Sequence, residues 1–222
     1  MRKNLIVSVI IILIANLVSA QGPNQNQSTR VGLFGGPTLA NMFKKVGGEK
    51  SSSNYVLGAT GGILLDVPMQ RYGSFQPGLN YVGKNSKEQV LNSSGELVQT
   101  QTNLSYLELP LNVLFRIPAG SGNATVGTGV ATAVALSGKM KSTGPTTNET
   151  KKLTFGDNAT NDYARYDFGI NVLAGYQFKN DFFVTFNYNI GIHRLFVGGD
   201  PDDKLYNRYF AMRVGIMFGG KK

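Results

Sequence analysis

The chain has 222 residues, with 22 Lys and Arg against 13 Asp and Glu, which gives a formal net charge of +9, and it contains no Cys. This length suits a single β-rich domain, and the lack of Cys excludes a disulfide-stapled secreted domain and a lipid-anchored lipoprotein. The basic excess fits anionic lipid headgroups better than nucleic acid, because the chain begins with an export signal and its lysines lie mainly in Gly, Ser and Asn-rich segments.

Residues 1–20 are predicted to be a cleaved secretory signal peptide. Two basic residues precede an apolar run, and a small-residue cleavage site ends the segment at Ala20. The apolar run is too short for a membrane-spanning helix, and no charged stop-transfer flank follows it. We therefore expect a short N-terminal segment over residues 21–29 and one domain over residues 30–222.

After this segment, apolar and polar residues alternate with a period of two, which is the pattern of a β-strand. In the clearest case, Phe182 to His193, the even positions are apolar and most odd positions are polar or small. A helix would not keep the polar residues on one side. The same alternation predicts eight strands, over residues 31–39, 55–67, 75–81, 106–117, 126–137, 166–178, 182–193 and 208–218.

The segments between the predicted strands alternate in length. Outer-membrane barrels have short periplasmic turns, longer external loops and an even number of strands. The expected fold is therefore an all-β, eight-stranded antiparallel up-and-down transmembrane β-barrel. A soluble lipocalin-like ligand-binding barrel, with its apolar face turned inward, is one alternative. In the predicted barrel, the long connections are the external loops, and short turns alternate with them. These loops are residues 42–54, 85–103, 138–164 and 195–206.

The inside of a barrel of this size is just wide enough for side chains to fill, which predicts a packed polar interior and no open pore. A charge in such an interior needs a partner, so the expected arrangement is a structural network of ion pairs. Asp66 and Arg116 lie near the same ends of their strands and form one candidate pair across the third strand. The inward charges are Asp66, Glu108, Arg116, Asp167 and Arg213.

One arrangement at the outer rim allows an enzymatic alternative. If the turn before the seventh strand centres on Asn180, Asp167 and His193 face each other, and Ser137 ends the neighbouring fifth strand. Ser, His and Asp can form a nucleophilic triad, in which the base removes the serine proton and the acid orients the base. A hydrogen-bonded rim residue is the simpler interpretation of His193. With one His, no Cys and no phosphate-loop pattern, we expect neither a metal nor a cofactor.

Many lysines fall in or beside the predicted external loops, where the phosphates of lipopolysaccharide would attract them. Solvation of ordinary loops explains these lysines as well. The candidates for contact with lipopolysaccharide are Lys44, Lys45, Lys139, Lys141, Lys151 and Lys152, with Lys50, Lys84 and Lys87 in similar positions.

Two runs are the most specific motifs of the chain, Gln76-Pro77-x-Leu79-x-Tyr81 and Tyr106-Leu107-Glu108-Leu109-Pro110-Leu111. Together with residues 31–36, 167–169 and 175–178, they resemble the PorT-type outer-membrane β-barrel family, which is common in bacteria of the Bacteroidota. The resemblance covers essentially the whole mature chain. It implies an eight-stranded barrel inserted by the outer-membrane assembly machinery, with no catalytic residues to transfer. The founding member is linked to a protein-secretion and gliding system, so an accessory role in secretion is one option.

The predicted function is that of a non-enzymatic barrel in the outer membrane. Its external loops would mediate adhesion, envelope interactions or contact with a secretion partner. The expected partners are outer-membrane lipid and lipopolysaccharide, the assembly machinery and a secretion-system or envelope protein, with no nucleic acid. A rim hydrolase and a soluble ligand-binding barrel are the alternatives.

Overall fold

The structure, a computed structural model, describes residues 28–69, 72–91, 95–146, 148–198, 200 and 202–220. The predicted signal peptide lies outside the described residues. Most of the described chain is in β-strands. The strands are β1 (Arg30–Val46), β2 (Glu49–Ser52), β3 (Asn54–Pro68), β4 (Gly73–Leu91), β5 (Leu97–Ala119), β6 (Gly122–Thr143), β7 (Asn148–Lys152), β8 (Tyr166–Gln177), β9 (Phe182–Gly191) and β10 (Lys204–Phe218).

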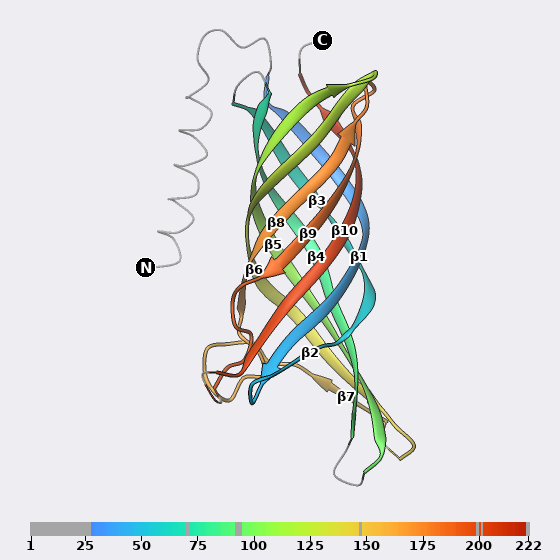
Figure 1. Cartoon of the computed structure of the whole chain (residues 1–222), viewed down its shortest axis with the longest axis vertical. Coiled ribbons are helices and arrows are strands. Elements are labelled where there is room, and N and C mark those ends of the chain that lie inside the picture. Colours follow the sequence, from blue (N-terminus) through green and yellow to red (C-terminus); the bar gives the residue numbers. More distant parts are fainter. Residues whose placement is uncertain are drawn as a thin grey trace.

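Eight of these strands form a closed barrel in which every strand pairs antiparallel with both neighbours (Figure 1). The order around the ring is β1, β3, β4, β5, β6, β8, β9 and β10, and β10 pairs back with β1, so that Val31 lies opposite Phe218. The short strand β2 pairs with β1, and the short strand β7 pairs with β6. The predicted eight-stranded up-and-down barrel is confirmed, and its closure satisfies the backbone hydrogen bonds that a lipid environment cannot.

The outward positions of the barrel form an apolar belt. Hydrophobic side chains in this position are favourable in lipid and costly in water. The apolar face is therefore outside, which is the reverse of the lipocalin-like alternative. Each of the eight barrel strands contributes exposed apolar residues, among them Leu39, Leu57, Leu79, Phe115, Val130, Val172, Phe186 and Phe210.

Among the residues that the structure describes, no helix has the length and apolar character needed to cross a membrane.

Side chains fill the lumen at two levels. At the end where the short turns lie, here called the turn end, Phe34, Phe183 and Met217 form one buried cluster. Toward the opposite end, here called the loop end, a larger cluster contains Tyr106 and Tyr209 together with loop residues such as Leu195. Loop side chains therefore fold into the mouth of the barrel and help to close it.

At the loop end the strands continue past the positions where the alternation predicts them to stop. Within the predicted loop 85–103, residues 85–91 pair with residues 97–103 as continuations of β4 and β5, with Leu91 opposite Leu97. Strand β6 enters the predicted loop 138–164, where it pairs with β7. Figure 1 shows β4, β5 and β6 extending together beyond the other strands of the barrel. The prediction of loops here is wrong, because both faces of the strands are largely polar beyond the apolar belt and no hydrophobic contrast marks them.

Candidate functional site

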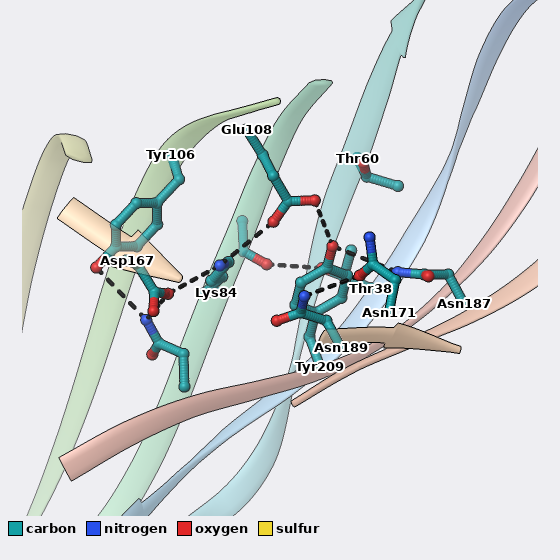
Figure 2. A network of polar contacts seen from close by, with 12 residues as sticks. Thr38, Thr60, Lys84, Tyr106, Glu108, Asp167, Asn171, Asn187, Asn189 and Tyr209 are labelled. Carbon is teal, nitrogen blue, oxygen red and sulfur yellow. Dashed lines mark hydrogen bonds and ion pairs between the residues drawn. The ribbon is translucent and has the colours of Figure 1, made fainter. Parts of the chain in front are cut away.

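A buried ion cluster lies in the lumen toward the loop end (Figure 2). The side chain of Lys84, on β4, is 3% exposed, and its Nζ lies 2.9 Å from Asp167 Oδ2 on β8 and 3.4 Å from Glu108 Oε2 on β5. The same Nζ lies 4.9 Å from the ring centroid of Tyr106 and 5.3 Å from that of Tyr209. The cluster thus connects β4, β5 and β8 through one shared cation.

Neutral partners complete the cluster. The Tyr209 hydroxyl donates a hydrogen bond of 2.7 Å to Glu108 Oε1, and Asn207 Nδ2 donates one of 2.9 Å to Asp167 Oδ2. The sequence places Lys84 beside an external loop, and this prediction is wrong. Since β4 continues to Leu91, its inward alternation also continues, and Lys84 points into the lumen.

Three asparagines bridge the lumen near this cluster. Asn189 Nδ2 on β9 donates a hydrogen bond of 2.8 Å to Asn171 Oδ1 on β8, and Asn171 Nδ2 donates one of 3.1 Å to Asn112 Oδ1 on β5. Strand β6 lies between β5 and β8 and has Gly129 at this level, opposite both Asn112 and Asn171. A Cβ at position 129 would approach Asn112 Oδ1 to 2.5 Å. The glycine therefore leaves the space through which the amides meet.

A second ion cluster lies at the turn end. The fully buried Asp66 is paired with Arg116 and with Arg30, whose Nη2 lies 2.8 Å from Asp66 Oδ2. Gln76 Nε2 donates a hydrogen bond of 3.0 Å to Asp66 Oδ1, and Arg30 Nη2 donates another of 3.0 Å to Gln177 Oε1. The predicted pair Asp66–Arg116 is present. Arg30 on β1 lies directly opposite Asp66 on β3, and it is not among the inward charges that the alternation predicts.

Arg213 on β10 is buried, with 4% exposure, and its guanidinium carbon lies 5.1 Å from the ring centroid of Phe34. Among the described residues, no partner accepts a hydrogen bond from its Nε or Nη2, and none forms an ion pair with it. The inward charges, which are expected to form one network of ion pairs, thus form two separate clusters. Glu108 and Asp66 belong to different clusters at different levels, and Arg213 is joined to neither by an ion pair.

The three residues of the hypothetical triad point in different directions. Gly169 lies opposite Gly191, which is the expected register of β8 and β9, but β9 ends there, before His193. The ring of His193 packs against Phe168, with 5.4 Å between ring centroids, whereas Asp167 contacts Lys84 inside the lumen. The predicted contact between Asp167 and His193 is therefore not formed.

Ser137 is separated from Asp167 by a β-bulge. The pairing of β5 with β6 shifts between Ser105 and Tyr106, so that Tyr106 pairs with Ala135 and Ser105 with Ser137. A one-residue shift reverses which face the side chains share. Ser137 is therefore exposed on the outer side of β6, and the geometry gives the triad no support.

A polar cavity of about 360 Å³ opens at the loop end, between β2, β4 and the loops that precede β8 and β10. Lys44 and Glu88, which form an ion pair of 3.2 Å, line it together with Tyr163. Burial raises the pKa of the Tyr163 phenol, which therefore remains neutral. No group of three or more His, Cys, Asp or Glu side chains that could hold a metal ion occurs in the described part of the chain.

Four lysines share the outer face of the extended strands at the loop end. Lys139 on β6 lies opposite Lys152 on β7, and Lys141 lies opposite Gln101, which in turn lies opposite Lys87 on β4. The described positions between them on this face carry amide, hydroxyl and apolar side chains and no Asp or Glu. We call Lys87, Lys139, Lys141 and Lys152 the lateral lysine face.

The other predicted lysines have different surroundings. Lys44 pairs with Glu88 in the polar cavity at the loop end, and Lys151 pairs with Asp162. Lys45 lies opposite Lys50 on β2 and Lys204 on β10, which forms a second basic group. The six candidates for lipopolysaccharide contact are therefore three members of the lateral lysine face, two ion-paired lysines, and Lys45.

A closed eight-stranded barrel with an apolar outer belt and a packed polar lumen defines the class of outer-membrane barrel proteins. A family model described as "Outer membrane protein beta-barrel domain" matches residues 19–197, and the chain belongs to this family. The protein is an outer-membrane protein, and the general orientation of such barrels makes the turn end periplasmic and the loop end external. Among curated proteins, none matches the chain.

Several solved structures are similar at low identity. Ail, the attachment invasion locus protein of Yersinia pestis, is 13% identical, with a TM-score of 0.40 and coverage of 85% of this chain and 99% of Ail. Neisserial surface protein A is 10% identical, with a TM-score of 0.39 and coverage of 86% and 99%. The outer membrane protease OmpT of Escherichia coli is 12% identical, with a TM-score of 0.30 and coverage of 86% and 96%. Similarity at this level carries no functional conclusion.

Proposed function

We propose that this protein is a non-enzymatic, non-conducting outer-membrane barrel whose extended external strands bind the phosphate groups of lipopolysaccharide. The observation that carries the proposal is the lateral lysine face. Lys139 and Lys152 are direct cross-strand neighbours, and like charges in this position repel each other. A bound anion relieves this repulsion. Lys44 and Lys151, in contrast, already have their charges neutralised by Glu88 and Asp162.

The position of the lateral lysine face along the barrel supports this partner. Leu136 is 54% exposed in the apolar belt, and Lys139 follows it by three residues on the same strand. Tyr81, also in the belt, shares a hydrogen bond of 2.8 Å with Ser105 at the polar boundary. The lysines therefore begin where the hydrocarbon layer ends and charged headgroups are concentrated.

The test is binding of purified lipopolysaccharide to the protein in a non-ionic detergent at several salt concentrations. A basic residue near a charged membrane surface contributes about 1 kcal/mol, so we expect Lys139→Gln with Lys152→Gln to weaken binding roughly thirtyfold. Binding should also weaken steeply with salt. The matched control is Lys44→Gln with Lys151→Gln, which removes the same charge and should change binding little. Equal losses in the two double variants would contradict the proposal.

The non-enzymatic part of the proposal is supported by the separation of Ser137, Asp167 and His193. We expect the purified protein to hydrolyse ester and lipid substrates no faster than a buffer control. Hydrolysis that is lost in Ser137→Ala would contradict this part of the proposal.

We further propose that the chain belongs to the PorT-type barrels of the Bacteroidota, on the strength of the two motifs over residues 76–81 and 106–111. An envelope or secretion-system protein would then be a partner of the external β4–β5 hairpin. The test is removal of residues 87–101 with a short turn in their place, followed by measurement of protein secretion and surface adhesion in the native host. Unchanged secretion and adhesion, with the shortened barrel still in the membrane, would argue against a partner at this hairpin.

A further inference from the structure

A small cavity of about 30 Å³ lies inside the periplasmic half of the barrel. Seven of the eight barrel strands line it, and the lining residues include Arg116, Arg213, Thr125 and Thr185. We propose that this cavity binds one small monovalent anion, of the size and charge of chloride, between Arg116 and Arg213. Nothing in the proposed contact with lipopolysaccharide requires this site.

The first argument is the local charge at the periplasmic end of the lumen. Asp66 pairs with Arg30 and Arg116, and the exposed Asp181 lies 3.6 Å from Arg30 at the periplasmic end. These two carboxylates balance two of the three arginines. The remaining positive charge belongs to Arg213.

In the external half, Glu108 and Asp167 share the single cation Lys84, which leaves one negative charge there. Among the described residues, however, neither carboxylate forms an ion pair with Arg213, so its guanidinium has no carboxylate in contact. A guanidinium is not deprotonated in a protein, so a buried arginine cannot avoid its charge as a lysine can. An unpaired charge in this position would be strongly destabilising.

The second argument is the unpartnered donors. Arg213 is 4% exposed, and its Nε and Nη2 donate to no described residue. The ring of Phe34 lies 5.1 Å from the guanidinium and attracts the cation, but it leaves these N–H groups without an acceptor. Buried N–H groups without an acceptor cost free energy. An acceptor that fills the cavity removes this cost.

The third argument is the type of occupant that the wall accepts. The amide of Gln177 uses its Oε1 to accept from Arg30, which leaves its NH₂ group as a donor. Guanidinium, amide N–H and hydroxyl groups together select a negatively charged acceptor and repel a cation. The volume suits a particle not much larger than water, which favours a monatomic anion over phosphate and organic anions. An anion in this cavity would connect β5 with β10 across the lumen.

The first experiment measures the temperature at which the purified protein loses its folded gel mobility, in a non-ionic detergent at constant ionic strength. Replacing gluconate with chloride should raise this temperature by a few degrees and reach saturation, because a ligand of the native state stabilises it. Arg213→Met should lose the dependence on chloride. Arg208→Met removes a charge on the same strand outside the lumen and should keep it.

The second experiment needs no variant. A crystal of the wild-type protein grown or soaked in bromide should show an anomalous peak between the guanidinium groups of Arg116 and Arg213. A peak there supports the site even if Arg213→Met fails to fold. If the position shows only water in bromide, the proposal is wrong whatever the unfolding temperatures show.

Discussion

Lys84 connects two buried carboxylates that no other described basic side chain reaches, since Glu108 and Asp167 form ion pairs with it alone. Lys84→Met removes the cation and leaves both acids in the lumen. Removal of one partner from a buried ion pair typically costs about 3–5 kcal/mol, and we expect a loss of this order in the free energy of unfolding. Urea titration followed by gel mobility measures it.

Two further variants check the cause of this loss. Lys87→Met changes an outward lysine on the same strand, and we expect it to affect stability by less than about 0.5 kcal/mol. Lys84→Met combined with Glu108→Gln and Asp167→Asn removes the whole charge cluster and should recover much of the stability. If Lys84→Met alone is as stable as the wild type, the cluster does not hold the strands together.

The sequence predicts the direction of most side chains in the lumen but not their partners. Alternation correctly turns Asp66, Glu108, Arg116 and Arg213 inward, because a strand has a fixed period of two. The pair Asp66–Arg116 could be predicted, because both residues lie near the same end. The position of Arg213 relative to the two clusters depends on the stagger of all eight strands, which short-range patterns do not determine.

At the level of a strand, β6 fits between β5 and β8 because its inward residues are small. In Gly129→Ala, the new Cβ would meet Asn112 Oδ1 at 2.5 Å and the backbone oxygen of Leu111 at a still shorter distance. We expect overpacking and loss of the Asn112–Asn171 hydrogen bond to cost about 1–3 kcal/mol in urea unfolding. Gly35→Ala is the matched control, because its Cβ meets only Thr60 O, at 3.8 Å. Equal stability of the two variants would show that the space at Gly129 is not required for the packing of β6 between β5 and β8.

The loop between β7 and β8 depends on the ionised form of Asp162. The hydrogen bond from Lys151 and the backbone hydrogen bond from Thr154 lower the pKa of the Asp162 carboxyl. Because this pKa is lower in the folded loop than its ordinary value of about 3.9, the stabilisation is complete above that value and is lost as the pH falls through the folded pKa. We expect protection of the Thr154 amide from hydrogen exchange, corrected for the intrinsic rate, at pH 6 and its loss in strong acid.

Asp162→Asn provides the control for this pH effect. The neutral amide keeps the size of the side chain but removes the charge that attracts Lys151, so the Thr154 amide should already be less protected at pH 6. Equal protection of the variant and the wild type at pH 6 would show that the charge is not what orders the loop.

The sequence predicts that strands exist where the barrel contacts lipid. It does not predict the residues at which these strands end. Residues 106–117 alternate between apolar and polar, and β5 contains all of them. In the hairpin beyond, outward Lys87 alternates with inward Ser86 and Glu88, so both faces look like a solvated loop. The bulge near Ser137 has no mark in the local sequence either, and it reverses the side on which this residue points.

For the whole molecule, the apolar exterior and the filled interior have separate consequences. The apolar exterior is suited to the outer membrane, which is also the location of the matching protein family. Inside, the ion cluster of Lys84, the asparagine bridge and the cluster of Phe34 occupy the lumen at successive levels. We therefore propose that this protein functions through its external surface and not through transport along the barrel.

The most direct measurement of this central claim is the conductance of the purified protein in a planar lipid bilayer with concentrated potassium chloride on both sides. We expect insertion without stable conductance steps, because packed side chains occupy the lumen. Insertion is verified on the same membranes by the heat-dependent gel mobility of the recovered protein. Reproducible, stable conductance steps from the folded protein would show that the lumen is open and would make the lumen the functional site.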